Sequence, residues 1–302
     1  MNNQKHYAAA VSAFVIWGFF PLLLRKLVEY SSGEILYFRI LFSSLVLLIV
    51  IFGFKRKDLQ AQRAFFNSLD SKKKWGTVIL TLIGGALLTI NWLTFIYIVN
   101  NVNIKTASFS YLICPVITAI LGYLLLKEKM TVLQWIAVAF CAISCVLMGY
   151  NSALELGYSF LTAVTYALYL ITQRRNQGFD RMIMLGFQVL FSFLLLNAIF
   201  PYLIHKVPTD LNFYLIITVI AIVFTVFPLF LNLFALNKIN SATIGILMYI
   251  NPLINYSIAF IVFEEDINVI QLVGYSIIFV ALILFNYPNL KKMQASFGAS
   301  NA

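Results

Sequence analysis

The chain has 302 residues, of which 62% are hydrophobic and 11% charged, and its formal net charge is +10. Soluble globular domains contain about 45–50% apolar and about 25% charged residues, so the composition excludes an ordinary water-soluble protein. In a soluble protein such a charge would suggest nucleic-acid binding. Here membrane topology accounts for it, so we expect no nucleic-acid partner and a lipid bilayer as the surroundings.

Apolar runs long enough to cross a hydrocarbon core of about 30 Å follow one another along almost the whole chain. The first run is too long and too aromatic for a cleaved signal peptide, so we expect it to remain as a membrane helix. The fold class is therefore an all-α membrane protein. Ten spans are predicted, at Tyr7–Leu24, Ile35–Phe54, Trp75–Val99, Thr106–Leu126, Met130–Tyr150, Leu156–Gln173, Met182–Ile204, Leu211–Leu236, Ser241–Phe263 and Ile267–Tyr287.

Basic residues are unevenly divided between the two sides of this arrangement. Of the 21 Lys and Arg residues, 16 fall on the side of the N-terminus, one lies within a span, and four lie on the opposite side. Because basic loops stay in the cytoplasm, both termini are predicted to be cytoplasmic. Ten spans agree with this, because an even number returns the chain to its starting side. We therefore expect a multi-pass protein of the inner or plasma membrane.

Arg39, in the second span, is the one charged residue inside a predicted span. A charge at the bilayer centre costs about 2.5–3.5 kcal/mol on insertion scales, so it needs an escape or a partner. Arg39 lies about 7 Å from the outer end of its span at about 1.5 Å per residue, and its side chain would reach the surface by snorkelling. The alternative, which we favour because intramembrane charges usually have a function, is a polar cavity on a solute path.

One long hydrophilic segment, residues 55–74, joins the second and third spans. Phe65, Phe66 and Leu69 would allow a short amphipathic helix on the membrane surface. We expect instead a solvated basic loop that fixes the topology.

The segment Val99–Gln134 is repeated later in the chain. Shifted by 137 residues, it aligns without a gap with Leu236–Gln271, with nine identities in 36 positions, and we interpret this as an internal repeat. The preceding parts align more weakly at an offset of 149, which places Arg25-Lys26 on Arg174-Arg175. The identities are Asn100/Asn237, Asn103/Asn240, Thr106/Thr243, Ile113/Ile250, Pro115/Pro252, Ile117/Ile254, Glu128/Glu265, Val132/Val269 and Gln134/Gln271.

Each half of the chain therefore holds five spans, with residues 1–150 forming the first repeat and residues 151–302 the second. Because five is odd, the second repeat must enter the membrane upside down relative to the first. Such inverted repeats are typical of secondary transporters, in which one half rocks against the other around a midplane site.

Pro115 and Pro252 occupy matching positions in the two repeats, about ten residues into their predicted helices. Each removes a backbone donor and frees a carbonyl, which is tolerated in lipid only where protein or a wet cavity satisfies that carbonyl. Both helices should bend at the same depth. The bends would either shape a central pathway or serve packing alone.

Polar and aromatic residues gather on the first, third, fourth, eighth and ninth spans. Asn side chains in hydrocarbon need partners, so they should face the bundle interior. Bonding between helices would explain any one of them, but their concentration favours a shared cavity, in which Trp and Tyr would stack on a flat or cationic solute. The residues are Trp17, Asn91, Trp92, Tyr97, Ser108, Ser110, Tyr111, Asn232, Tyr249, Asn251 and Asn255.

All eleven Asp and Glu residues fall in loops or at the ends of predicted helices, so proton coupling through a buried acid has little support. No phosphate loop, nucleophile elbow or metal-spaced set of His and Cys occurs, so we expect no enzyme, no metal and no cofactor. The three Cys lie within predicted spans and are interpreted as apolar fillers. No G-x-x-x-G motif occurs, and a homodimer is left open.

Several motifs occur in a recognisable order. The third to fifth spans carry Asn91-Trp92-Leu93-Thr94-Phe95-Ile96-Tyr97, Asn100-Asn101, Ala107-Ser108, Tyr111, Pro115, Leu121-Gly122, Glu128 and Gln134-Trp135. The rest of the chain adds Trp17-Gly18, Pro21, Glu34-Ile35-Leu36 with Arg39, and Tyr249 to Pro252 with Glu265. Over nearly its whole length, the chain resembles the RarD-like permeases of the EamA family, in the drug/metabolite transporter superfamily.

This resemblance implies two inverted five-helix repeats, a central cavity lined mainly by the first, third and fourth helices of each half, and transport of small organic solutes across the inner membrane. RarD-like permeases tend to have a Glu at the position of Gln188. This departure puts any coupling of transport through an acid at that position in doubt. The residues implied to line or gate the cavity are Trp17, Arg39, Asn91, Trp92, Tyr111, Tyr249 and Asn251.

Together these features predict a permease that moves a small metabolite or drug-like solute by alternating access, with Arg39 binding an anionic part of the solute. A passive facilitator or channel is the alternative within transport. A membrane receptor or scaffold is a weaker alternative, because it would usually keep a soluble output domain and the longest loop here has only about 20 residues.

Overall fold

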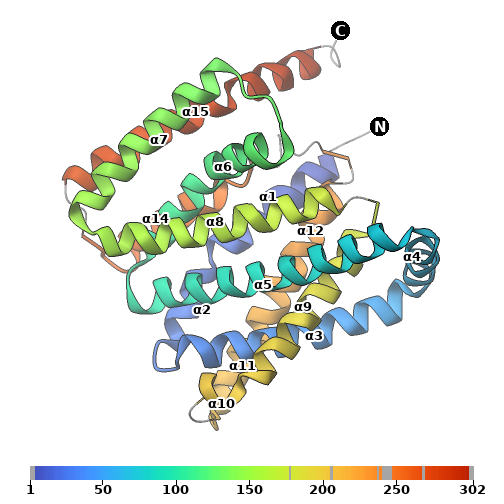
Figure 1. Cartoon of the computed structure of the whole chain (residues 1–302). Coiled ribbons are helices and arrows are strands. Elements are labelled where there is room, and N and C mark those ends of the chain that lie inside the picture. Colours follow the sequence, from blue (N-terminus) through green and yellow to red (C-terminus); the bar gives the residue numbers. More distant parts are fainter. Residues whose placement is uncertain are drawn as a thin grey trace.

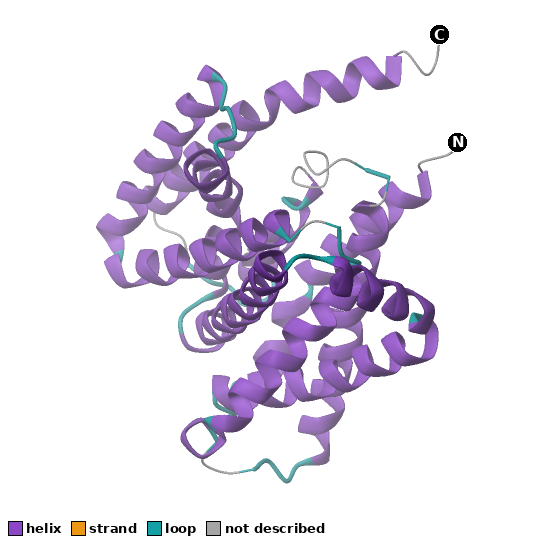
Figure 2. Ribbon diagram, turned by 45° about the vertical axis from the view of Figure 1, so that its right-hand side comes forward, coloured by secondary structure: helices purple, strands orange, loops and turns teal. Residues whose placement is uncertain are grey.

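The computed structural model describes residues 4–176, 178–204, 207–236, 238–239, 247–266 and 269–298. Within these residues the chain is helical and contains no strand (Figure 2). The first half contains α1 (Gln4–Gly18), α2 (Phe20–Leu24), η1 (Arg25–Leu27), α3 (Ser32–Phe54), α4 (Arg56–Ser68), α5 (Ser71–Asn101), α6 (Ile104–Leu126) and α7 (Val132–Asn151). The second half contains α8 (Ala153–Arg175), α9 (Arg181–Ala198), α10 (Phe200–Leu203), α11 (Leu211–Ala221), η2 (Ile222–Val226), α12 (Phe227–Leu236), α14 (Ile250–Ile261) and α15 (Val269–Gly298).

In the part of the chain that the structure describes, eight stretches of helix are long and apolar enough to cross a membrane. They correspond to eight of the ten predicted spans. The fifth and ninth spans coincide with two shorter apolar helices, Val132–Leu147 and Ile250–Ile261, and part of the ninth span falls outside the described residues. The count of ten and the inverted repeat therefore remain predictions, whereas the all-helical membrane fold is confirmed.

Large apolar side chains cover the outside of the helices. Because a soluble protein rarely exposes wide apolar patches, this surface fits a lipid surrounding. Strongly exposed examples are Ile49, Phe52, Trp75, Val132, Val146, Ile261 and Val269.

Polar side chains mark where several helices begin. Ser31 and Glu34 form a reciprocal capping box at the start of α3, in which each side chain accepts the other residue's backbone N–H. Asn103 accepts the backbone N–H of Thr106 at the start of α6. These caps satisfy backbone donors that a helix leaves free at its first turn.

Helices from the two halves of the chain pack on one another. α7 lies along α15 (Figure 1), α3 packs on α9 and α11, and α5 packs on α8 and α9. α6 contacts α8 and α14, while α1 contacts α12 and α14. The start of α1, the end of α15 and helix α4 all lie on one side of the molecule (Figure 1).

The prediction of a solvated loop at residues 55–74 was wrong, because residues 56–68 form α4. The rings of Phe65 and Phe66 lie 5.1 and 6.4 Å from the ring of Phe179, in the loop between α8 and α9. Lys55, just before α4, forms an ion pair of 2.6 Å with Asp180. These contacts hold α4 against that loop.

Candidate functional site

A small cavity surrounds Arg39 at the centre of the bundle. Its volume is about 80 Å³, enough for a few water molecules and below the roughly 300–1,000 Å³ of typical ligand pockets. Eight helices (α1, α2, α3, α5, α6, α8, α12 and α14) and the π-helical segment η2 contribute to its wall. The lining residues are Phe14, Trp17, Phe20, Arg39, Leu88, Trp92, Phe95, Tyr111, Tyr166, Tyr169, Thr225, Leu229, Met248 and Asn251.

The Arg39 side chain is only 3% exposed and so does not snorkel to the surface. Its guanidinium carbon lies 4.7 Å from the ring centroids of both Phe20 and Trp92. Its Nε atom donates a 3.0 Å hydrogen bond to Thr225 Oγ1, whereas Nη1 has no partner among the described residues. Two aromatic faces and one hydroxyl thus hold a cation that forms no ion pair within the part of the chain that the structure describes.

The segment η2 supplies Thr225 because the helix there departs from α-helical geometry. Residues Ile222–Val226 form a π-helical turn, a feature often found at functional sites. Pro228 follows and has no backbone N–H, so it cannot bond the carbonyl of Phe224, four residues earlier. Trp17 Nε1 donates to that carbonyl at 3.0 Å, and α1 is thereby joined to η2 at the cavity wall.

Aromatic rings form a continuous chain along the wall. Phe20 lies 5.7 Å from Phe224 and 5.9 Å from Phe95, and Phe95 lies 5.5 Å from Tyr111. Tyr111 lies 5.8 Å from Tyr166, which continues the chain into α8. These centroid separations are typical of favourable aromatic pairs, so the wall presents flat, polarizable faces around the single cation.

Asn91 is fully buried but does not line the cavity. Its amide donates to Thr162 O at 2.8 Å, and its Oδ1 accepts from the Tyr111 hydroxyl at 3.3 Å. It therefore connects α5, α6 and α8 and holds Tyr111 in the wall. These hydrogen bonds satisfy the Asn91 side chain, which explains how an Asn is tolerated at a fully buried position.

The other predicted site residues divide into two groups. Trp17, Trp92, Tyr111 and Asn251 line the cavity with Arg39, and Asn251 Oδ1 accepts a 3.0 Å hydrogen bond from Asn255. Tyr249 lies outside this wall and packs against an apolar cluster of α6, α7, α8 and α15.

The two predicted helix bends are placed differently. Pro115 lies inside α6, which continues to Leu126. Pro252 lies in the first turn of α14, directly after turns at Met248 and Tyr249. Because the first turn of a helix leaves its backbone donors free, Pro252 costs no hydrogen bond there.

Phe20 and Thr225 touch Arg39 but were not singled out from the sequence. A Phe or a Thr in an apolar span gives no distinguishing signal. Pro228 did carry one, because its missing N–H marks the Phe224 carbonyl as needing another donor. Gln188 is buried between α9 and α5, away from the cavity wall, close to Gly84 and Gly85.

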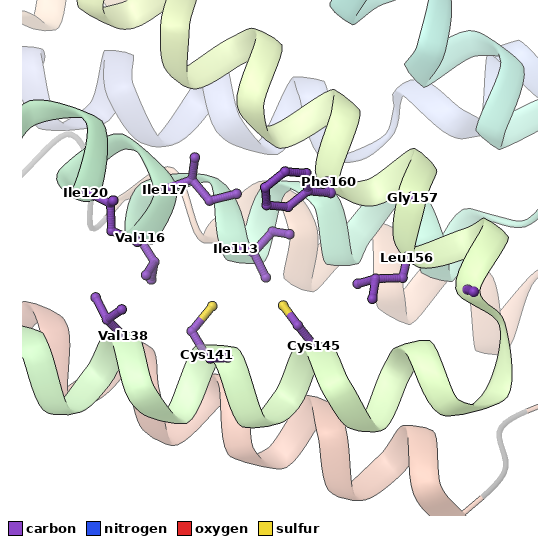
Figure 3. A pocket seen from close by; sticks show the side chains of 12 residues that line it. Ile113, Val116, Ile117, Ile120, Val138, Cys141, Cys145, Leu156, Gly157 and Phe160 are labelled. Carbon is purple, nitrogen blue, oxygen red and sulfur yellow. The ribbon is translucent and has the colours of Figure 1, made fainter. Parts of the chain in front are cut away.

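A larger cavity, of about 570 Å³, lies between α6, α7 and α8 (Figure 3). Its wall is apolar, and the sulfur atoms of Cys141 and Cys145 point from α7 towards α6. Among the described residues no charged side chain lines it, so the described wall offers no charge to orient a polar solute. We therefore place the functional site at the smaller cavity around Arg39.

The Arg39 cavity offers one fixed positive charge, flat aromatic faces and one amide. No cluster of three or more His, Cys, Asp or Glu residues that would hold a metal ion exists among the described residues. A buried polar cavity inside a bundle of membrane-spanning helices is typical of integral membrane transporters.

Comparison with known proteins identifies the family. The sequence model of the EamA-like transporter family matches residues 4–150 and again residues 154–287, and the chain belongs to this family. It is 29% identical to the uncharacterized transporter YojE of Bacillus subtilis (strain 168), over 98% of both chains. It is 25% identical to protein RarD of Escherichia coli (strain K12), over 94% of both chains.

A solved crystal structure shares the fold. It aligns with 94% of this chain and 98% of its own, with a TM-score of 0.61 and 12% sequence identity. The chain is therefore a multi-pass membrane transporter that resembles the RarD proteins, and not an enzyme.

Proposed function

We propose that this transporter moves a small organic solute carrying an anionic group across the plasma membrane by alternating access. The observation that carries the proposal is Arg39: a buried guanidinium in the central cavity, with a free Nη1 atom and no acidic partner among the described residues. Arginine binds carboxylate and phosphate groups through its planar N–H donors. A solute anion would supply the hydrogen-bond acceptor and the negative charge that Arg39 lacks among the described residues.

The surrounding residues then have separate roles. Trp17, Trp92 and Tyr111 form flat walls that would orient the solute, and Asn251 offers an amide on the cavity wall. Asn91 supports Tyr111 from behind through its hydrogen bond. Tyr249 packs outside the cavity wall and therefore does not contact the solute in this proposal.

Alternating access requires two halves that rock around the site. The 137-residue repeat in the sequence supports this, as do the two successive matches of one family model, to residues 4–150 and 154–287. With five spans in each half, as the sequence predicts, the two halves would have opposite orientations.

A passive facilitator is the second candidate. No carboxylate of the described residues lines the Arg39 cavity, and position 188 holds the neutral Gln188. Neither place therefore offers an acid among these residues to carry a proton. Flux into vesicles with and without an imposed pH gradient separates the two: equal fluxes support passive transport.

The proposal is tested by comparing metabolites in cells that lack the protein, overproduce it, or overproduce Arg39→Gln at the same level. We expect the wild-type protein to change the cellular content of at least one small organic anion, and Arg39→Gln to abolish that change. An Asp70→Asn variant, altered in an exposed loop residue, is the matched control. An anion that moves equally well with Arg39→Gln would remove Arg39 from the binding site.

A further inference from the structure

Two ion pairs join the halves of the chain at opposite ends of α6. Arg25 contacts Glu265 near the start of α6, and Arg174 contacts Glu128 just after its end. α6 has 23 residues, so its ends lie about 33 Å apart at about 1.5 Å per residue. This separation matches the hydrocarbon thickness of a bilayer, about 30 Å, and the pairs therefore lie at opposite faces of the membrane.

The first pair is embedded in a larger set of contacts. Arg25 Nη2 lies 3.2 Å from Glu265 Oε1. The same carboxylate accepts the backbone N–H groups of Ile104 and Lys105, at 2.8 and 3.2 Å. Lys105 Nζ bonds the carbonyl oxygen of Asp266, so Glu265 and its neighbour fasten the first turn of α6.

The second pair is simpler and more exposed. Arg174 Nη1 contacts both oxygens of Glu128, at 2.9 and 3.0 Å. The side chains of Arg174 and Glu128 are 41% and 47% exposed, compared with 25% and 11% for Arg25 and Glu265.

The two pairs occupy corresponding positions in the repeat. Glu128 corresponds to Glu265 at the offset of 137, and Arg25 to Arg174 at the offset of 149. The local backbone agrees: Lys127 and Glu264, which precede the two acids, have positive φ angles of 56° and 49°. Glu128 N donates to Gly122 O at 3.2 Å, and Glu265 N to Ala259 O at 3.0 Å, again 137 residues apart.

We propose that Arg25–Glu265 and Arg174–Glu128 are the two gates of the transport cycle, one at each membrane face, which open in alternation. This inference rests on the proposed alternating access. Each pair joins residues of different halves, so a rocking motion that separates the halves at one face must break the pair at that face. Both pairs are formed here, in agreement with the small volume of the cavity between them.

The gates differ in strength. Arg174–Glu128 is an exposed pair, and its loss should change the equilibrium between the closed and open gate by about two- to fivefold. Glu265 holds three donors in a more buried position, and loss of hydrogen bonds to a buried charge changes an equilibrium by about tenfold or more. The resting protein should therefore open more readily at the face that carries Glu128.

The test measures access to the cavity from each side and does not require the solute to be known. Leu229→Cys, on the cavity wall, serves as the reporter in a chain whose Cys114, Cys141 and Cys145 are Ala. A membrane-impermeant maleimide is added to right-side-out or inside-out vesicles, and the labelling rate is measured. Glu128→Gln and Glu265→Gln are compared with Asp70→Asn, whose ion pair with Lys73 is local to the start of α5.

We expect Glu128→Gln to raise labelling from its own face by about two- to fivefold and to lower labelling from the other face. Glu265→Gln should raise labelling from the face that carries Glu265 by about tenfold or more and lower labelling from the face that carries Glu128. The exchanged pair Glu128→Arg with Arg174→Glu should restore wild-type rates. The exchange Glu265→Arg with Arg25→Glu should not, because arginine cannot accept the N–H groups of Ile104 and Lys105.

The outcomes separate the two proposals. If the reporter is labelled from both faces in the wild type but neither Gln variant shifts the balance, the gates are wrong and alternating access stands. If the reporter is labelled from one face only, both without a gate substitution and in every gate variant, alternating access itself fails. Should the cysteine-free chain not fold, hydrogen exchange of residues 104–106 in the natural chain gives the same answer: it must rise in Glu265→Gln and fall in Glu128→Gln.

Discussion

At the scale of single residues, the question is how a guanidinium is stable inside a membrane protein without an acid beside it. Cation–π contacts contribute about 2 kcal/mol when the cation is desolvated, and Arg39 makes two of them, with Phe20 and Trp92. A hydrogen bond to Thr225 adds to this. These contacts are of the size of the insertion cost of a buried Arg, about 2.5–3.5 kcal/mol, so the site can hold the charge ready for an anion.

Thr225→Val should destabilise the protein by about 1–3 kcal/mol, because it leaves Arg39 Nε buried without an acceptor. Thr225→Ser keeps the hydroxyl and should cost about 1 kcal/mol or less. The measurement is the thermal unfolding midpoint of the purified protein in detergent. Equal midpoints for the Val and Ser variants would show that the hydroxyl contributes nothing to the placement of Arg39.

Residue identity predicted only part of this site. Arg39, Trp17 and Trp92 stand out in a sequence because charged and large amphipathic side chains are rare inside spans. Phe20 and Thr225 do not, since their role depends on which helices are neighbours. Asn91 was correctly expected to need a partner, but whether that partner is a solute or the Tyr111 hydroxyl depends on distances between helices.

At the scale of helices, hydropathy predicted most elements, while a helix at α4 was only the less favoured alternative for residues 55–74. Its polar sequence gives it no buried residue, so the signal for burial was absent. What positions α4 is contact with a loop of the other half, through Phe179 and Asp180. Such contacts between distant segments leave no local pattern in the sequence.

The Lys55–Asp180 pair gives this contact a pH dependence. Burial is the largest single influence and opposes the charge on both groups, but the hydrogen bond and charge attraction between them, the backbone N–H groups of Met182 and Ile183 at Asp180, and Asp58 beside Lys55 together outweigh it. The pKa of Asp180 is therefore lowered from 3.8 and the pKa of Lys55 is raised from 10.5. The stabilisation by Asp180 is complete above its unfolded pKa and disappears as the pH falls through the lower folded value. The stabilisation by Lys55 is complete below its unfolded pKa and disappears as the pH rises through the higher folded value.

The unfolding midpoints of the wild type and Asp180→Asn should therefore differ by a constant amount between about pH 5 and pH 9, equivalent to about 1 kcal/mol for a partly exposed pair. The difference should shrink below about pH 4 and above about pH 10.5. Asn keeps the N-cap of α9, so the comparison isolates the charge. A difference that persists unchanged at pH 3 would contradict the assignment.

At the scale of the whole molecule, the packing supports the predicted duplication. If the five spans of one half are exchanged with those of the other, the α5–α8 contact corresponds to α1–α12, and α6–α8 to α1–α14. The contacts α3–α9 and α7–α15 correspond to themselves. Sequence alone could suggest two halves from the 137-residue offset, but their interleaving around Arg39 could not be predicted, because no local pattern encodes which helices meet.

The central claim is that Arg39 makes this cavity a site for an anionic solute, and ligand-induced stabilisation of the purified protein tests it most directly. A ligand that binds only the folded state at 100 times its Kd stabilises it by about 2.7 kcal/mol. Matched probes of nearly equal shape, such as benzoate with benzamide and butyrate with butyramide, differ in charge and in the replacement of one acceptor oxygen by an NH2 donor.

We predict that at least one acid raises the unfolding midpoint of the wild-type protein while its amide does not, and that neither raises the midpoint of Arg39→Gln. Equal stabilisation by an acid and its amide, or stabilisation by the acid that persists in Arg39→Gln, would contradict the account.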